Sequence, residues 1–179
     1  MKTINLILAS ALISGSVLFF ACSKENSDTG SSPNGTTQLK VKMTDAPIVA
    51  DSVNVDIREV WVNFRSDSVQ GWLTLNTNAG VYNLLGLQNG IDTLLAVATV
   101  PADTLRQVRF LLGTNNSIVV NGIRYPLTIP SGAESGLKIN VSKKLNTNLD
   151  SLTIDFDAAL SIHQTGNGVY MLRPVLRVK

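Results

Sequence analysis

Residues Ser151 to Lys179 read SLTIDFDAALSIHQTGNGVYMLRPVLRVK, and this stretch decides the fold. Apolar side chains occupy the even positions from Leu152 to Ile162, and they return at even positions from Tyr170 to Val178. Alternation with a period of two is typical of a strand that has one buried face and one wetter face. Between the two runs, a three-residue Gly-Asn-Gly loop keeps the even positions of both strands on one face, and Gly168 suits the left-handed last position of such loops. The pattern predicts a long β-hairpin that closes the chain.

The register of this hairpin decides how its charged residues are interpreted. It places Asp157 opposite Arg177 and Asp155 opposite Lys179, on one face. Two carboxylates on one strand face could be ligands of a calcium ion, which prefers several oxygen atoms. The alternative is two cross-strand ion pairs, each worth about 0.2–1 kcal/mol. Because two cations lie opposite, we favour the ion pairs and keep Asp155 and Asp157 as candidate metal ligands. Pro174 has no N–H to donate, so we expect the last strand to be an edge strand or to be bulged there.

The N-terminal segment carries an export pattern. Residues 1–21 hold one lysine and then an apolar run, which ends at Ala21-Cys22. The run is too short and too rich in small residues for a transmembrane helix. It resembles a bacterial lipoprotein signal peptide. The resemblance implies that Cys22, the only cysteine of the chain, is lipidated with several acyl chains such as palmitate and becomes the mature N-terminus.

A polar segment follows the cysteine. Residues 23–38 contain no strongly apolar side chain, so we interpret residues 22–38 as a flexible tether with a lipidated first residue. The Ser-Lys-Glu after Cys22 resembles export signals that send some lipoproteins of the Bacteroidetes group to the outside of the outer membrane. We therefore expect an outer-membrane lipoprotein, periplasmic or surface-exposed, whose membrane contact is the lipid on Cys22.

The remaining residues, 39–179, fit one domain with its own core. The whole chain has 15 basic and 13 acidic residues and a formal net charge of +2. No run of basic residues provides the electrostatic footprint that nucleic acid requires, so we expect no nucleic-acid partner.

Short apolar segments separated by turn residues fill this domain. A phase slip at Arg58-Glu59 predicts a β-bulge, and Asn121-Gly122 predicts a type I′ hairpin turn. Residues 93–100 are the one place where a helical turn could compete with a strand. The pattern predicts an all-β, antiparallel sandwich. Its expected strands before the closing hairpin are 39–43, 53–64, 105–112, 118–120, 123–125 and 137–141, with short apolar segments at 72–75, 81–87 and 93–100 between them.

Five motifs occur in one order between Leu39 and Val178. They are Thr44-Asp45-Ala46-Pro47, Tyr82-Asn83-Leu84-Leu85, Pro130 to Lys138, Asp155-Phe156-Asp157-Ala158, and Gly166 to Pro174. In this combination the chain resembles a bacterial family called domain of unknown function 4382. The resemblance implies an exported lipoprotein and a Greek-key sandwich similar to transthyretin-like and immunoglobulin-like modules. The family has no established activity, so the resemblance transfers no catalytic residues and no cofactor.

The sequence offers little support for catalysis. The single histidine, His163, lies near the hairpin tip, and one histidine cannot supply the usual zinc sets. Asp155 and Asp157 could be spaced like a glycosidase pair, but the cations opposite them would keep both ionised and remove the general acid. Glu134 lies in a Gly-containing loop and has no identifiable partner. We expect a non-enzymatic protein without a cofactor, and a carbohydrate-active hydrolase is the least favoured alternative.

Three residues are candidates for ligand binding. Trp61 lies on the strand face opposite Val60 and Val62, where it could stack against a sugar ring or pack beneath a loop or second sheet. Asp45 and Glu134 lie in segments that could meet at one end of the sandwich beside the Asp155 strand, or could serve turn formation alone. We expect a module that binds or scaffolds at the envelope, with a glycan or a protein as its partner. The alternative is a purely structural spacer domain.

Overall fold

The structure, a computed structural model, describes residues 35–66, 70–130, 136–166 and 168–179. The predicted signal peptide, Cys22 and most of the predicted tether lie outside the described residues. Within them the chain forms fourteen β-strands, a 3-10 helix η1 (Leu84–Leu87) and a short α-helix α1 (Ala158–Ser161). No helix among these residues is long and apolar enough to cross a membrane.

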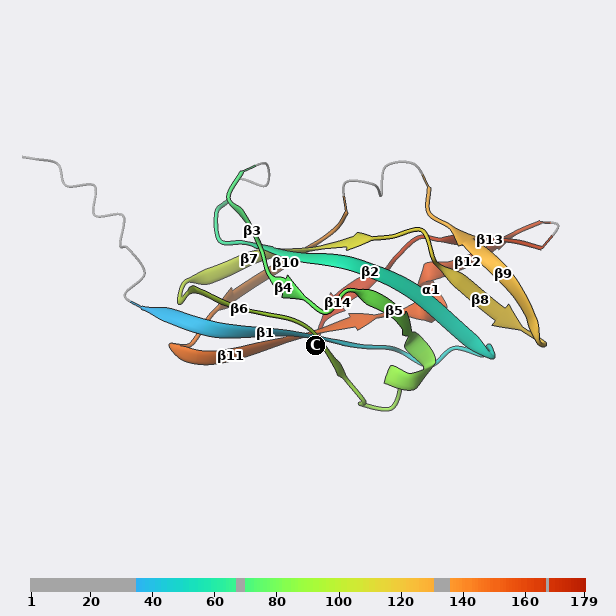
Figure 1. The fold of residues 1–179 in the computed structure, drawn as a ribbon, viewed down its shortest axis with the longest axis horizontal. Coiled ribbons are helices and arrows are strands. Elements are labelled where there is room, and N and C mark those ends of the chain that lie inside the picture. The colour runs from blue at the N-terminus through green and yellow to red at the C-terminus, as the bar shows by residue number, and fades with distance from the viewer. Residues whose placement is uncertain (1–34, 67–69, 131–135, 167) are drawn as a thin grey trace, which may run out of the picture. The chain divides into compact units, whose positions relative to one another are not determined.

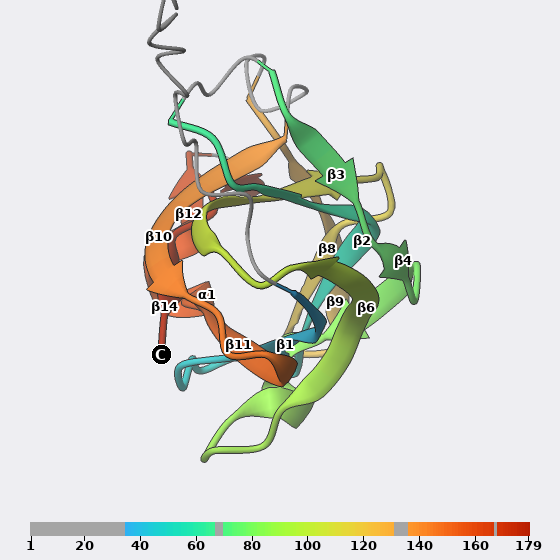
Figure 2. The ribbon, with the colours of Figure 1, turned by 90° about the vertical axis from the view of Figure 1, so that its left-hand side faces the viewer.

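The strands form two mixed sheets that share one core (Figures 1 and 2). The five-stranded sheet has the order β14 (Leu176–Val178), β11 (Asn148–Phe156), β1 (Thr36–Thr44), β6 (Thr93–Pro101) and β4 (Asn76–Thr77). The nine-stranded sheet has the order β10 (Leu137–Lys144), β7 (Thr104–Leu112), β2 (Ser52–Asn63), β8 (Ser117–Val120), β9 (Ile123–Thr128), β13 (Val169–Leu172) and β12 (Ile162–Thr165). Two short strands, β3 (Trp72–Thr74) and β5 (Gly80–Asn83), also pair with β2.

The all-β, sandwich-like fold is confirmed, but the sheets are not purely antiparallel. β1 runs parallel to β11, and β13 runs parallel to β9. Tight turns join only antiparallel strands, whereas parallel partners need long connections. β1 and β11 are separated by residues 45–147, so no local turn sets their relative direction.

Local signals in the sequence predicted several details of the sheets correctly. The pairing of β2 with β7 shifts between Ile57 and Glu59, which is the predicted bulge. Asn121 and Gly122 both have positive φ, 52° and 75°, as a type I′ turn requires. Residues 93–101 form the strand β6 and not a helix, and this strand pairs with β1 on one side and with β4 on the other.

The closing hairpin differs from the prediction of two uninterrupted strands. Its base, β11 with β14, belongs to the five-stranded sheet, and its tip, β12 with β13, belongs to the nine-stranded sheet. The helix α1 interrupts the first strand where the chain crosses between the sheets (Figure 1). Asp157 accounts for the break, because its side chain accepts a hydrogen bond from the Leu160 amide and so caps the helix.

The hairpin registers keep the predicted parity. At the tip, Thr165 lies opposite Val169 across the predicted three-residue loop. At the base the pairing is shifted by two residues, so Asp155 lies opposite Arg177 and not opposite Lys179 as expected. A shift of two residues leaves the paired side chains of β11 and β14 on their predicted faces, and Phe156 and Leu172 are fully buried. Leu160 breaks the expected pattern and is 48% exposed, because it belongs to α1. β14 lies at a sheet edge, as Pro174 predicted.

Candidate functional site

The Asp45 side chain contacts the closing hairpin at α1, where the hairpin crosses from one sheet to the other. It is only 3% exposed, and its carboxylate accepts hydrogen bonds from the Ala158 amide at 2.9 Å and from Gln88 Nε2 at 3.3 Å. Burial raises the pKa of Asp45 to about 6; the hydrogen bonds lower it, and the nearby Asp155 charge adds a smaller rise. These contacts tie the end of β1 to α1 and to the segment that follows η1, which are both distant in the sequence.

Asp157 and Asp155 lie beside this junction. Asp157 is 6% exposed, caps α1, and lies 3.5 Å from the Arg177 guanidinium, so the predicted Asp157–Arg177 ion pair is present. Asp155 faces Arg177 across the strands, and its Oδ1 is buried without a hydrogen bond. In the described parts of the chain, no group of three or more histidine, cysteine, aspartate or glutamate residues is placed to hold a metal ion.

Glu134 lies outside the described residues, as does most of its loop. Gly136, at the end of that loop, has a positive φ of 84°, and a Cβ atom there would lie 2.8 Å from Arg109 Cγ. The end of the loop therefore lies against the nine-stranded sheet beside Arg109, where only glycine leaves room.

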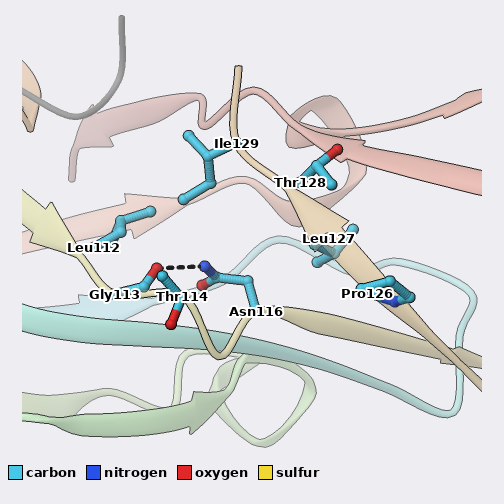
Figure 3. A pocket seen from close by; sticks show the side chains of 8 residues that line it. All are labelled: Leu112, Gly113, Thr114, Asn116, Pro126, Leu127, Thr128 and Ile129. Atoms are coloured by element: carbon cyan, nitrogen blue, oxygen red, sulfur yellow. Dashed lines mark hydrogen bonds between the residues drawn. The ribbon is translucent and has the colours of Figure 1, made fainter. Parts of the chain in front are cut away.

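A pocket of about 390 Å³ lies between the end of β7 and the strand β9. Figure 3 shows residues from the β7–β8 connection on one side and residues of β9 and its continuation on the other. The volume falls within the range of small-molecule sites, roughly 300–1,000 Å³. Its lining has no titratable side chain and so provides no general acid or base; it consists of Leu112, Gly113, Thr114, Asn116, Pro126, Leu127, Thr128 and Ile129.

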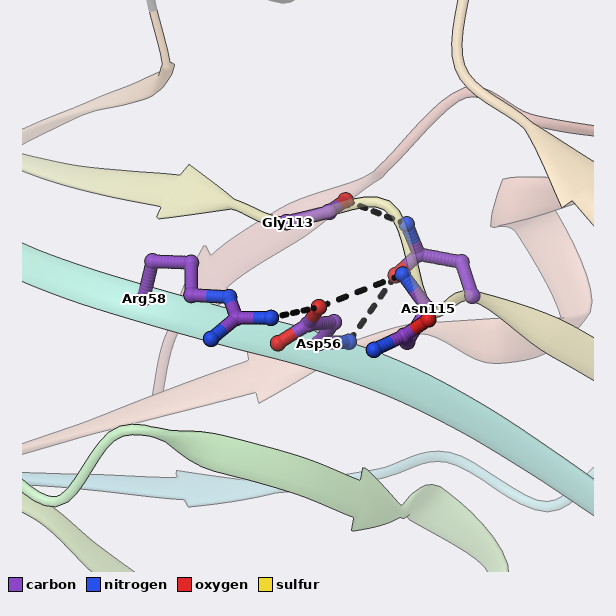
Figure 4. Close-up of polar contacts among 5 residues, drawn as sticks. Asp56, Arg58, Gly113 and Asn115 are labelled. Atoms are coloured by element: carbon purple, nitrogen blue, oxygen red, sulfur yellow. Dashed lines mark hydrogen bonds and ion pairs between the residues drawn. The ribbon is translucent and has the colours of Figure 1, made fainter.

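A buried polar network closes the β7–β8 connection against β2 (Figure 4). Asp56, which is 1% exposed, pairs with the Arg58 guanidinium at 2.8 Å and accepts a hydrogen bond from the Asn115 amide. Its own amide donates to Asn116 Oδ1 at 2.9 Å. The Gly113 amide donates to the Asp56 carbonyl, and a Cβ at Gly113 would overlap the Asp56 carboxylate and the Arg58 guanidinium. These contacts hold the β7–β8 connection in place against β2.

The outer face of the nine-stranded sheet brings together two tryptophans and an arginine. Trp61 on β2 lies opposite Arg109 on β7 and opposite Thr74 on β3. The Arg109 guanidinium carbon lies 5.5 Å from the centre of the Trp61 ring and 4.0 Å from the centre of the Trp72 ring. Both distances are within the range of cation–π attraction. We call these three residues the Trp61–Arg109–Trp72 cluster.

The cluster is partly withdrawn from water, and its tryptophan positions are fixed. Trp61 Nε1 donates a hydrogen bond of 2.6 Å to Glu59 Oε2, which holds the indole against the sheet. All three side chains are half-buried. Burial lowers the pKa of Arg109, whose Nε is buried without a hydrogen-bond partner. The arrangement can bind flat apolar surfaces through the rings and an anion through the guanidinium.

Sequence reasoning found only part of this cluster. It placed Trp61 on the face opposite Val60 and Val62, and the structure confirms this, because both valines are fully buried while Trp61 is half-exposed. It did not connect Trp61 with Trp72 or Arg109. Alternation in residues 105–112 could have placed Arg109 on an outer face, but the pairing of β3 with β2 has no local signal in the sequence.

The fold is thus that of an all-β, sandwich-like domain that presents an aromatic and cationic cluster on one sheet. The chain belongs to the family described as Domain of unknown function (DUF4382), whose family model matches residues 36–174. No curated protein and no solved structure matches the chain.

Proposed function

We propose that this protein is a lipid-anchored, non-catalytic module of the bacterial cell envelope that binds a glycan through the Trp61–Arg109–Trp72 cluster. The observation that carries the proposal is the contact of one guanidinium with two indole rings on the outer face of the nine-stranded sheet. Tryptophan, tyrosine and arginine are enriched among the residues that contribute most of the binding energy at protein–protein interfaces.

The polar residues beside the cluster favour a glycan. Gln107 and Asn140 lie in the next cross-strand row of the same face, and Gln107 Nε2 donates a hydrogen bond of 3.0 Å to Asn140 Oδ1. Ring faces beside amide groups suit sugars, because a sugar presents C–H groups on its faces and hydroxyl groups at its edge. A protein partner would more often require a broad apolar centre around the aromatic residues.

The acidic residues support binding over catalysis. The carboxylates of Asp45 and Asp157 accept hydrogen bonds from backbone amides within the fold. A glycosidase needs one carboxyl group that delivers a proton and a second that acts on the opposite side of the scissile bond. Asp45 is the acid with a pKa raised to about 6, and its 3% exposure keeps it from a substrate. A carbohydrate-active hydrolase therefore remains the least supported alternative.

The proposed location in the cell envelope is supported by the sequence that precedes the β-sandwich domain. Residues 1–21 and Cys22 resemble a lipoprotein signal with its acylated cysteine. Replacing Cys22 by Ala in the full chain is expected to move the protein from the membrane fraction to the soluble fraction. A variant that stays in the membrane fraction, together with a wild-type chain that takes up no acyl label, would remove the anchor from the proposal.

A glycan array probed with the full-length protein in detergent tests the binding activity. The two tryptophans of the chain are both in the cluster, so intrinsic fluorescence reports on this site without a label. We expect selected glycans to bind, to change the fluorescence, and to lose most of their affinity in Trp61→Ala. Ile123→Ala, which changes an exposed side chain at the start of β9, is the matched control and is expected to bind normally.

The rival proposal is a structural spacer domain. It predicts that no glycan binds and that Trp61→Ala leaves every interaction of the protein in the envelope unchanged. Absence of glycan binding by the wild-type chain on an array that covers neutral and acidic envelope glycans would favour this alternative.

A further inference from the structure

The charges around the cluster point to the kind of glycan. Arg109 makes no ion pair and no hydrogen bond with any described residue. Of its three guanidinium nitrogens, only Nε is a buried atom without a partner. The two terminal nitrogens therefore reach the surface of the domain. A cation that is stacked on aromatic rings and forms no ion pair with a described residue retains its capacity to bind an anion.

A second cation extends this positive surface. Lys138 on β10 lies directly opposite Arg109 on the same outer face and is exposed. Glu59, an acidic residue of β2 on this face, already accepts the hydrogen bond of the Trp61 indole. The cross-strand row thus runs from an aromatic ring through a guanidinium to an ammonium group, and this order matches a sugar ring that carries an acidic substituent.

The geometry of a guanidinium suits anions that present two oxygen atoms side by side. Its terminal nitrogens form a planar fork that binds a carboxylate through two parallel hydrogen bonds. The rings of Trp61 and Trp72 contact the same guanidinium, so they hold the fork in one plane and lower the entropy that is lost when a ligand binds.

We propose that the ligand of the Trp61–Arg109–Trp72 cluster is a carboxylate-bearing sugar, as in a uronic-acid polysaccharide, with its ring on the tryptophans and its carboxylate on the Arg109 fork. This inference rests on the proposed function and adds the chemical class of the glycan. Lys138 contributes charge attraction at the edge of the same site.

The test uses two polymers that differ only in the acidic group. The full-length protein in detergent is titrated with polygalacturonate and with the same polymer after its carboxylates are reduced to alcohols, and tryptophan fluorescence is recorded. We expect the acidic polymer to bind roughly tenfold more tightly or better, because charge-assisted hydrogen bonds are about twice as strong as neutral ones.

Variants assign this preference to Arg109. Arg109→Gln is expected to bind the two polymers equally, and Arg109→Lys to keep only part of the preference because it lacks the fork. Arg106→Gln, which removes an exposed arginine from the same strand, is expected to retain the full preference. Thermal unfolding of each variant shows whether the fold is intact, and Arg109→Lys keeps the test decisive should Arg109→Gln unfold.

The outcomes separate the two proposals. Equal binding of both polymers by the wild-type chain would overturn the carboxylate assignment and leave the glycan-binding function standing. Equally tight binding of dextran sulfate would also overturn it, because a general polyanion site needs no sugar carboxylate. Absence of binding to both polymers and to every other glycan would overturn the proposed function itself.

Discussion

Asp45 and Arg109 are both charged side chains withdrawn from water, and they differ in what surrounds them. Asp45 lies inside the junction of β1 and α1, where the Ala158 amide and the Gln88 side chain donate to its carboxylate. Arg109 lies on the outer sheet face, where two indole rings contact its guanidinium and no described residue accepts a hydrogen bond from it. The first side chain ties distant segments together through these hydrogen bonds. The second is held in place and keeps its hydrogen-bonding capacity for a ligand.

The largest effect on stability is expected from the core next to the buried acids. Phe156 is fully buried and directly precedes Asp157, so Phe156→Ala should lower the free energy of unfolding by about 3–5 kcal/mol. Leu160→Ala, four residues further along and 48% exposed, is the matched control and should cost less than about 1 kcal/mol. Denaturant unfolding measures both. Similar values for the two variants would mean that the junction is not part of the core.

The next effect is a pH dependence that belongs to Asp45. The pKa of this carboxyl is about 6 in the folded protein against 3.8 for the free group, so the folded state binds the proton more tightly. Stability from this group is therefore present at low pH and is lost as the pH rises from about 4 to 6, by up to roughly 3 kcal/mol at 1.36 kcal/mol per unit. Asp45→Asn should flatten this part of the stability curve relative to wild type. Asp92→Asn, at an exposed acid, is the control; an Asp45→Asn curve that runs parallel to wild type would contradict the assignment.

A glycine beside another partnered acid should have a smaller effect. Gly113→Ala places a methyl group against the buried Asp56 carboxylate and the Arg58 guanidinium, and overpacking of this kind costs about 1–3 kcal/mol. Gly80→Ala adds the same methyl group in a strand with no atom within 4 Å and should be nearly neutral. Thermal unfolding distinguishes them. Equal melting temperatures would show that the Asp56 network can shift to accommodate the methyl group without loss of stability.

The smallest effect on stability is expected at the ligand-binding cluster. Arg109→Gln removes two cation–π contacts, each worth about 0.5–1 kcal/mol at exposed sites, and relieves a desolvated charge in return. The free energy of unfolding should therefore change by only about 1 kcal/mol, close to the value for Arg106→Gln. A loss as large as that of Phe156→Ala would make the cluster a structural element and would end the contrast with Asp45.

Residues close together in the sequence account for most of what could be predicted. The period-two alternation identified the strands, the phase slip at Arg58-Glu59 marked the bulge, and Asn121-Gly122 marked the turn. The prediction was wrong where a local pattern was interrupted by a distant contact. The alternation around Asp157 predicts a strand residue. In the structure Asp157 caps α1, and the adjacent Ala158 amide donates a hydrogen bond to the distant Asp45.

The candidate site shows the same division. Trp61 could be placed on an outer face because Val60 and Val62 flank it. Trp72 joins the cluster only because β3 pairs with β2, and Lys138 only because β10 pairs with β7. Such pairings depend on the whole sheet, and a change of register by one residue would turn every side chain of the strand to the opposite face.

By itself the sequence determined the all-β class of this protein, the faces of its strands and the parity of its closing hairpin, because alternation is a property of neighbouring residues. Only the tertiary structure decided that two strand pairs run parallel, that the hairpin crosses between the sheets, and that one guanidinium meets two indoles. Those outcomes depend on contacts between residues far apart in the chain, whose free energy is gained only when the sheets assemble around their common core.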